Sequence, residues 1–401
     1  MIYSFDLSRF TVYSHFFSQS WFQDFLIFFS LNKFESLFLI IFLWSCTPNT
    51  PRENIKKPEP VQSEPVTLIF AGDVMHHMPQ MYAAYVPETN LLDYTPCFQY
   101  IKTTVQKADL AFCNLETSLG GKPFSGYPRF SAPDELLYAL KETGFDVIQM
   151  ANNHVLDRGS RGLERAIELI RNEGMRHVGA YVNQDQHDTH YPLMIDIKGI
   201  KIAVLNVTYG TNGLMVKKPN VVNVFDSLQV LSDIRKAREL SADIIIMLAH
   251  WGYEYHLYSN ADQDEIAGFC VGHGVDLIIG SHPHVVQNVR FIENKEKGRL
   301  VPVFYSLVNF ISNQTDIYRN GGLLAHIKIN KDKKYISAVS ITPLYVFKGS
   351  VNHKRQYYLI PSNDFLKNTA NYPIPSADSV SVVQFHNDIK RRLKNVMIEN
   401  K

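Results

Sequence analysis

From residue 66 onward, short runs of apolar residues end abruptly in clusters of Asp, Asn, Glu or His. The runs are rich in Val, Ile, Leu and Phe, and each is too short for a typical helix, which is the pattern of buried strands. The sequence therefore predicts buried strands at residues 66–71, 108–113, 145–150, 242–248 and 275–279.

Segments with helical periodicity lie between these strands. Residues 133–143 begin with Pro and acidic residues and stop at Gly144, which match the usual start and stop signals of helices. The same helical periodicity is found in residues 162–173, 225–240 and 261–272. This alternation predicts an α/β fold with a layered sheet. Because ligands bind beyond the carboxyl ends of strands in such sheets, we expect the polar clusters to meet in one crevice.

The last part of the chain, residues 331–401, carries no cluster of catalytic residue types. Residues 335–343 and 356–360 have the pattern of strands, and residues 382–394 have that of an amphipathic helix. We expect this part to complete the preceding domain, residues 66–330, and not to form a separate module. A basic group in the helix is interpreted as a solvated face and not as a contact for lipid or polymer. It consists of Lys390, Arg391, Arg392 and Lys394.

The amino terminus has the pattern of a secretory signal. Residues 36–43 are apolar, Lys33 precedes them, and the sequence LWSC occupies residues 43–46. A positive residue, a short apolar segment and a small residue before the cleavage point define such signals, and this segment is too short to span a bilayer. The ending resembles a bacterial lipobox. We therefore expect a signal peptide at residues 1–46 and lipidation of Cys46.

A transmembrane anchor over residues 21–44 is the alternative interpretation. It would place Asn32, Lys33 and Glu35 in the middle of the span, where polar residues are costly. The short apolar segment favours the lipoprotein. Residues 47–65 contain five prolines and no periodic pattern, which indicates a flexible tether. The mature protein is thus expected outside the cytoplasm, lipid-anchored to the bacterial cell envelope and bound to the membrane through that anchor.

Composition limits the partners that the chain can have. Of its 401 residues, 45% are hydrophobic and 20% are charged, as in a globular protein with a core. The formal net charge is +1, so there is no basic field for a nucleic acid, and none is expected as a partner. The four cysteines form no CxxC motif, which excludes a zinc ribbon. A bridge between Cys97 and Cys113 is conceivable in an oxidising compartment, but buried free thiols are the favoured interpretation.

The side chains at the strand ends are a suitable ligand set for metals. Carboxylates, imidazoles and an amide suit Mn, Fe or Zn. His282 and His284 are two residues apart on an extended chain, which places both rings on one side. The set is too large for one tetrahedral site and suits two divalent metals that share a bridging carboxylate. Its members are Asp73, Glu116, Asn153, His154, His250, His282 and His284.

Each of these residues has a plainer explanation when it is taken alone. An Asp after a strand is usually a turn or capping residue, and the pair Asn152-Asn153 would most often form a turn. A His beside Trp251 is more often packed than ligating. Their joint occurrence at five strand ends favours a metal site over coincidence.

Taken in order, the clusters resemble the motifs of the CapA family of capsule-synthesis proteins. The motifs are GDVM at 72–75, NLE at 114–116, ANNH at 151–154, HWGxE at 250–254, GxHPH at 280–284 and SLVNF at 306–310. Val308 stands where the last motif of the family has glycine. The resemblance covers residues 66–328, and the six motifs are specific as an ordered set. It implies a role in poly-γ-glutamate capsule synthesis and export and the four-layer α-β-β-α sandwich of the calcineurin-like metallophosphoesterases.

The resemblance also implies roles for individual residues. His154 corresponds to a catalytic acid or to a residue that orients the ligands. Met75 is a departure, because phosphoesterases have histidine there and a thioether is a poor ligand for a hard metal. One metal is therefore expected to be weak or absent, and His76 and His77 lie one and two residues too far along to replace the missing ligand. The implied metal ligands are Asp73, Glu116, Asn153, His250, His282 and His284, with Glu116 where a bridging aspartate is usual.

Further residues of the motifs are expected to face the substrate or to orient the ligands. They are Asn152, Trp251, Glu254 and Asn309. Carboxylates near a ligating imidazole commonly fix its orientation, although Glu254 is equally well explained as an exposed loop acid.

Two functions remain open on the sequence. The first is a metal-dependent hydrolase or transferase that acts on a phosphoester or an anionic polymer, with other capsule-assembly proteins as partners. Because no Ser, Cys or Lys lies in a recognisable nucleophile motif, activated water would attack and His154 would protonate the leaving group. The second is a non-catalytic scaffold that binds a polyanion in a capsule-export complex. Met75 favours the scaffold, and the conventional His motifs favour the enzyme.

Overall fold

The structure, a computed structural model, describes residues 63–399. The predicted signal peptide, Cys46 and most of the predicted tether lie outside the described residues. No helix in the described part of the chain is both long and apolar enough to cross a membrane.

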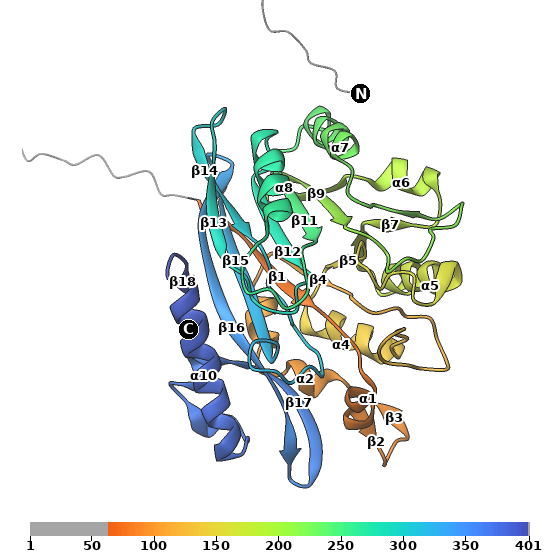
Figure 1. Cartoon of the computed structure of the whole chain (residues 1–401), viewed down its shortest axis with the longest axis vertical. Coiled ribbons are helices and arrows are strands. Elements are labelled where there is room, and N and C mark those ends of the chain that lie inside the picture. Colours follow the sequence, from red (N-terminus) through yellow and green to blue (C-terminus); the bar gives the residue numbers. More distant parts are fainter. Residues whose placement is uncertain (1–62, 400–401) are drawn as a thin grey trace, which may run out of the picture. The chain divides into compact units, whose positions relative to one another are not determined.

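One mixed sheet, here called sheet I, joins the beginning and the end of the described chain (Figure 1). Strands β1, β4, β5 and β6 are parallel neighbours, and β15, β16 and β17 extend the sheet from β1 in antiparallel order. The order across the sheet is β17 (Lys354–Pro361), β16 (Tyr335–Val351), β15 (Gly321–Asn330), β1 (Val66–Asp73), β4 (Leu110–Asn114), β5 (Val147–Gln149) and β6 (Arg176–Val178), with β18 (Met397–Ile398) paired to β16.

A second mixed sheet, sheet II, has a parallel centre formed by β9, β11, β12 and β14. Its edge strands β8 and β13 are antiparallel to their neighbours. The order is β13 (Val289–Asn294), β14 (Arg299–Phe304), β12 (Leu277–Ser281), β11 (Ile244–His250), β9 (Ile200–Thr208) and β8 (Leu193–Ile197). Two small ribbons pair β2 (Tyr85–Val86) with β3 (Leu91–Leu92), and β7 (Ala180–Tyr181) with β10 (Val221–Val222).

Helices follow most of the parallel strands and cover the sheets. Between β1 and β6 lie α1 (Met78–Ala84), α2 (Thr95–Phe98), α3 (Lys102–Gln106), α4 (Asp134–Thr143) and α5 (Gly159–Asn172). Between β7 and β12 lie α6 (Gln184–His190), α7 (Ser227–Glu239) and α8 (Ala261–Gly272). The chain ends with α9 (Ser362–Phe365), the 3-10 turn η1 (Thr369–Asn371) and α10 (Ser376–Arg392), and α10 runs alongside β16 in Figure 1.

Alternation along β1 shows how the layers stack. Leu68 and Phe70 belong to a core that also contains sheet II, α7 and α8. Ile69 and Ala71, on the opposite face, belong to a second core shared with α4 and α5. The order helices, sheet I, sheet II, helices follows, which confirms the predicted four-layer α/β sandwich.

Each predicted element has a counterpart in the structure with somewhat different ends, and the helix expected at 382–394 is α10, which begins at Ser376. The helix expected at 261–272 is α8, and the strands expected at 335–343 and 356–360 are parts of β16 and β17, which join sheet I beside β15. Cys97, Cys113 and Cys270 are buried free thiols, so the favoured interpretation of these cysteines is confirmed and the Cys97–Cys113 bridge is absent.

Candidate metal centre

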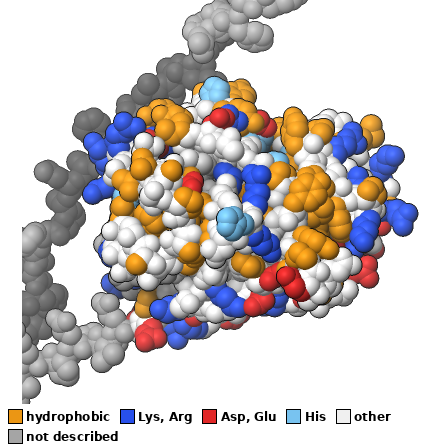
Figure 2. Space-filling view, turned by 90° about the horizontal axis from the view of Figure 1, so that it is seen from below, with side chains coloured by type: hydrophobic (Ala, Val, Ile, Leu, Met, Phe, Trp, Pro, Cys, Tyr) orange, Lys and Arg blue, Asp and Glu red, His pale blue; other side chains and the backbone are white. Residues whose placement is uncertain are grey.

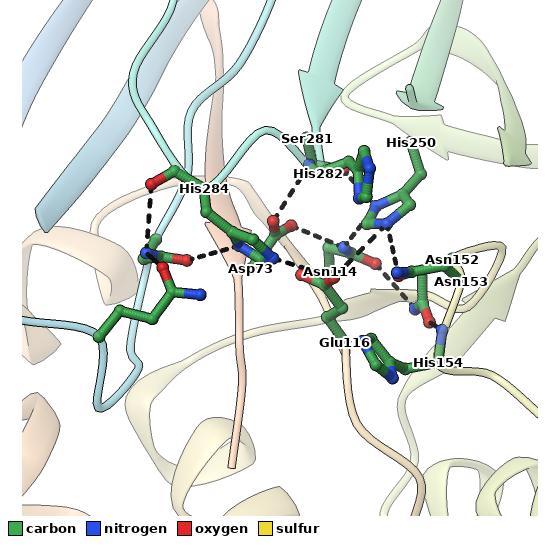
Figure 3. Close-up of polar contacts among 12 residues, drawn as sticks. Asp73, Asn114, Glu116, Asn152, Asn153, His154, His250, Ser281, His282 and His284 are labelled. Atoms are coloured by element: carbon green, nitrogen blue, oxygen red, sulfur yellow. Dashed lines mark hydrogen bonds and ion pairs between the residues drawn. The ribbon is translucent and has the colours of Figure 1, made fainter. Parts of the chain in front are cut away.

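The predicted ligands converge where the carboxyl ends of both sheets meet (Figure 3). Asp73 is the last residue of β1, and His250 is the last residue of β11. Glu116 follows β4, and His282 and His284 follow β12. All five are at most 3% exposed. Residues separated by more than two hundred positions thus share one buried crevice.

Two groups of ligand atoms share a single carboxylate. The first group consists of Asp73, Glu116 and His284, and the second consists of Glu116, His250 and His282. Within each group the ligand atoms lie within 4.8 Å of one another. Oε1 of Glu116 is 3.6 Å from His250 Nε2 and 4.0 Å from His284 Nε2. Glu116 therefore has the position expected of a bridging ligand between two metals.

The chemistry of the donor set fits divalent metals. Both carboxylate oxygens of Glu116 are buried without a hydrogen-bond donor, as is Nδ1 of His282. Burial, and then the neighbouring Asp73, raises the pKa of Glu116 well above its usual range. An uncompensated buried carboxylate is costly, and metal cations would compensate it.

The histidines are held in the neutral form that binds metals. Burial lowers the pKa of His250 well below its usual range, and burial together with His284 lowers the pKa of His282 to about 3. Burial also lowers the pKa of His284. His282 and His284 have positive φ angles of 100° and 55°. Such backbone is uncommon outside glycine and collects at functional sites.

Hydrogen bonds fix the ring orientations of two of the predicted ligands. Ser281 Oγ is 3.0 Å from His250 Nδ1, and Asn309 Oδ1 is 3.1 Å from His284 Nδ1. In both rings Nε2 is thereby left to face Glu116. The orienting role expected of Asn309 matches this contact, whereas Ser281 was not predicted, although its place just before the HPH motif is a usable signal.

The amide cluster beside His250 extends the site. Asn153 Oδ1 is 2.9 Å from His250 Nε2, so its oxygen faces the second ligand group. The side chain of Asn152 is occupied by other contacts. Its amide donates to Asn114 Oδ1 at 3.1 Å and to the Leu115 carbonyl. Asn114, absent from the predicted set, donates to Asp73 Oδ1 at 2.7 Å. Its register position opposite Asp73 would have identified it, but register is visible only in the sheet.

His154 lies at the edge of the ligand groups. Its Nδ1 is 2.8 Å from Asp157 Oδ2, and both side chains are buried. After burial, the nearness of the His284 and His154 rings is a further cause of the lowered pKa of His282, so the three imidazoles lie in one neighbourhood. Asp157 was also missed; the spacing His154-x-x-Asp157 on a turn was its signal.

Trp251 is buried between the sheets, whereas Glu254 is exposed at the rim of the site. The Trp251 indole is in the core between the sheets, where its Nε1 donates to the Tyr305 carbonyl at 2.9 Å. It also lines a cavity of about 320 Å³ beside His250, together with Tyr209 and Tyr253. Glu254 is exposed, but its charge contributes to raising the pKa of Glu116, so it belongs to the rim of the site.

Met75 and the two histidines after it supply no ligand to either group. Met75 is buried and is two residues from Asp73 on the same strand end. His76 Nε2 bonds the Tyr94 hydroxyl at 2.9 Å, and His77 interacts with Gln80. No other His, Cys, Asp or Glu side chain of the described residues joins Asp73, Glu116 and His284 in their group.

Comparison with known proteins agrees with the resemblance in the motifs. The bacterial capsule synthesis protein PGA_cap family matches residues 67–314. The capsule biosynthesis protein CapA of Bacillus anthracis is 26% identical over 303 residues, which cover 72% of this chain and 69% of that protein. The PGA biosynthesis protein CapA of Bacillus subtilis is 25% identical over 331 residues, which cover 79% and 82%.

Solved structures with weak similarity include a nucleotidase and a phosphoesterase. The NAD nucleotidase of Haemophilus influenzae has a TM-score of 0.44 at 12% identity, over 82% of this chain and 60% of that chain. The calcineurin-like phosphoesterase YfkN of Bacillus subtilis has a TM-score of 0.38 at 14% identity, over 81% and 97%. Because the family match spans more than half of the sequence, the chain belongs to the bacterial capsule synthesis protein PGA_cap family.

Proposed function

We propose that this protein is a two-metal-dependent hydrolase or transferase of the bacterial cell envelope, which acts on a phosphoester or an anionic polymer during capsule synthesis. The observation that carries the proposal is Glu116, a buried carboxylate shared by two groups of metal ligands. Capsule synthesis is the role named for the family and for its CapA relatives.

The residues of the site would have separate roles in binding metals and in donating a proton. Asp73 and His284 would hold one metal with Glu116, and His250, His282 and the Asn153 oxygen would hold the other. Two divalent metals, such as Mn, Fe or Zn, supply Lewis acidity and lower the pKa of water to about 7. Asp157 holds the His154 ring by Nδ1, which leaves Nε2 to deliver a proton to the leaving oxygen.

A covalent intermediate on a cysteine is disfavoured. Burial raises the pKa of Cys97 and of Cys270 to about 12, so neither thiol ionises at neutral pH. Both also lie in the hydrophobic cores and not among the metal ligands. Attack by water fits these constraints.

The test is metal analysis of the purified full-length protein in detergent, paired with hydrolysis of a generic phosphodiester and of an oligo-γ-glutamate. We expect two metal positions, of which the one at Asp73 is filled more weakly because Met75 replaces a histidine. His284→Ala should remove one metal and most of the activity, and Glu116→Gln should reduce the occupancy of both positions. A wild-type protein without bound metal would refute the proposal.

The second candidate is a non-catalytic scaffold that binds a polyanion in a capsule-export complex. Met75 favours it, because the Asp73 group lacks the histidine usual at that position. Full metal occupancy with neither hydrolysis nor transfer on any anionic polymer would select the scaffold over the enzyme.

A further inference from the structure

Lys348 continues an apolar face of β16. Alternate residues of a strand share a face, so Lys348 follows Leu344 and Val346, which belong to the core under α1 to α5. Its ammonium donates to the carbonyl oxygen of Gln314. Within residues 63–399 no carboxylate is paired with it, which is unusual for a largely buried lysine. The position therefore calls for an anionic partner from outside the chain.

A chain of hydrogen bonds connects Lys348 to the metal ligands. Gln314, whose carbonyl accepts from Lys348, also accepts from Asn309 Nδ2 through its Oε1 at 3.1 Å. The same Asn309 is 3.1 Å from Nδ1 of His284 through its Oδ1. Two residues, Gln314 and Asn309, thus connect Lys348 to His284, which belongs to the Asp73 group.

Two further basic residues accompany Lys348. His77, at the start of α1, accepts from the Asn313 backbone N–H at 3.4 Å. Burial lowers the pKa of His77 to about 4 against the opposing hydrogen bond with Gln80, and His284 and Lys348 are close enough to lower it further. Arg355 of β17 has its guanidinium 5.8 Å from the Tyr357 ring, and Tyr357 is opposite Lys348 in the register.

The electrostatics of this region favour an anion. Burial, and then Arg355, lowers the pKa of Lys348 to about 7. The groups that face it are Arg355 and the Tyr357 hydroxyl from β17, His77 from α1 and the Gln314 carbonyl from the loop before β15. The acid of that loop, Asp316, is paired with Arg319. Figure 2 looks onto the lower side of Figure 1, where the β16–β17 hairpin ends, and basic side chains and a histidine gather near the middle of this face.

We propose that Lys348, supported by Arg355 and His77, is the anion-binding wall of the metal site and positions a phosphate or carboxylate group of the substrate beside His284. The inference rests on the proposed function, which it deepens by assigning the recognition of the anionic group. Lys348 would contact the anionic group itself, and Gln314 and Asn309 connect it to His284. Phosphate and carboxylate share the chemistry that such an ammonium recognises.

The test measures the binding of dimethyl phosphate and of glutarate to the metal-loaded full-length protein, by calorimetry at pH 6 and pH 8. Both anions carry at least one negative charge at both pH values, and dimethyl phosphate does not titrate between them, so its pH dependence reports on the protein alone. Lys348 loses its proton as the pH rises through its pKa, and wild-type affinity should therefore fall with rising pH. Lys348→Met should weaken binding at pH 6 by about tenfold or more. Tighter binding of dimethyl phosphate would identify a phosphate group of the substrate as the bound anion, and tighter binding of glutarate would identify a carboxylate group.

Lys348→Arg is the decisive variant, because arginine stays charged at both pH values. It should bind the anion at pH 6 as tightly as the wild type does. It should also lack the fall in affinity that deprotonation of Lys348 causes in the wild type, as Lys348→Met does. Lys354→Met, which removes a charge from an exposed position of the same hairpin, should bind as the wild type does. All three should retain the metals.

Wild-type affinity in Lys348→Met, or an unchanged pH dependence in Lys348→Arg, would overturn the inference. If Lys348→Met fails to fold, the arginine variant still decides, since it keeps the charge. The measurement needs no turnover, so a metal-loaded protein that shows Lys348-dependent binding but no hydrolysis would refute the proposed catalysis and leave the anion-binding wall standing. Anion binding that is lost in Glu116→Gln and unaffected in Lys348→Met would assign the anion to the metals alone.

Discussion

His154 has the contacts of a proton donor. Asp157 Oδ2 lies 2.8 Å from His154 Nδ1 and also accepts the Phe130 backbone N–H at 2.7 Å, so the carboxylate is itself held in place. Removal of a positioned acid usually slows a reaction by about a hundredfold or more. We therefore predict that His154→Gln keeps both metals and lowers kcat by about that factor on a phosphodiester, as measured by steady-state kinetics beside metal analysis.

Asp157→Asn is the matched variant for this prediction. It retains the shape of the side chain and removes the charge that orients the ring, so kcat should fall by less than in His154→Gln. Loss of a metal in His154→Gln would instead make His154 a ligand, and an unchanged kcat would exclude it as the acid.

The sequence was sufficient to identify the residues that carry distinctive chemistry. Glu116, His250, His282 and His284 could be assigned because carboxylates and imidazoles after apolar runs are uncommon, and the structure brings them together. Asn114 was not assigned, because an amide at the end of a strand is ordinary until the register places it opposite Asp73. The roles of all these residues remain predictions.

At the scale of elements, the strands continue into the polar residues that were predicted to follow them. Residues 242–248 were the predicted strand, whereas β11 is Ile244–His250. His250 is still paired with Thr208 of β9 and with Ser281 of β12. Hydropathy indicates which side chains are buried, whereas the ends of a strand are set by backbone pairing. The predicted and observed strand ends therefore differ by about two residues.

Gly280 permits the close approach of β12 and the segment after β14. A Cβ at this position would overlap the Tyr305 carbonyl oxygen and Nε1 of Trp251, which are themselves hydrogen-bonded. We predict that Gly280→Ala destabilises the fold by about 1–3 kcal/mol or more and lowers metal occupancy, since His282 is two residues away. Thermal unfolding and metal analysis of the variant check both effects.

Gly268→Ala is the control for this substitution. Gly268 lies on an exposed part of α8 with no atom near an added Cβ. Alanine is a better helix former there, so the variant should gain about 0.5–1 kcal/mol and keep its metals. Equal unfolding temperatures for Gly280→Ala and the wild type would show that strand β12 tolerates a side chain at this point.

At the scale of the whole molecule, the strand–helix alternation was enough to predict the layers but not the closing of sheet I. β1 pairs with β15, which comes about two hundred and fifty residues later in the sequence. Hydrophobic patterns are local, and a pairing between distant strands leaves no local trace. The same pairing places the loop before β15, with Asn309 and Gln314, beside the predicted ligand His284.

The last prediction concerns how the protein is attached to the cell. We propose that Cys46 is lipidated and that the catalytic domain is tethered to the envelope through it; this residue lies outside the described part of the chain. Because a thioether at this cysteine would carry the acyl chains, Cys46→Ser should abolish lipid labelling and release the protein from membranes.

The measurement is fractionation of cells that express either form, combined with labelling by a fatty-acid analogue. A mutant that stays in the membrane with its leader uncleaved would support the alternative anchor over residues 21–44. The metal centre offers an internal control, because Cys46→Ser is remote in sequence from every proposed ligand. Released protein with full metal occupancy and unchanged hydrolysis would separate attachment from catalysis, and loss of capsule in that strain would then show that the reaction must take place at the membrane surface.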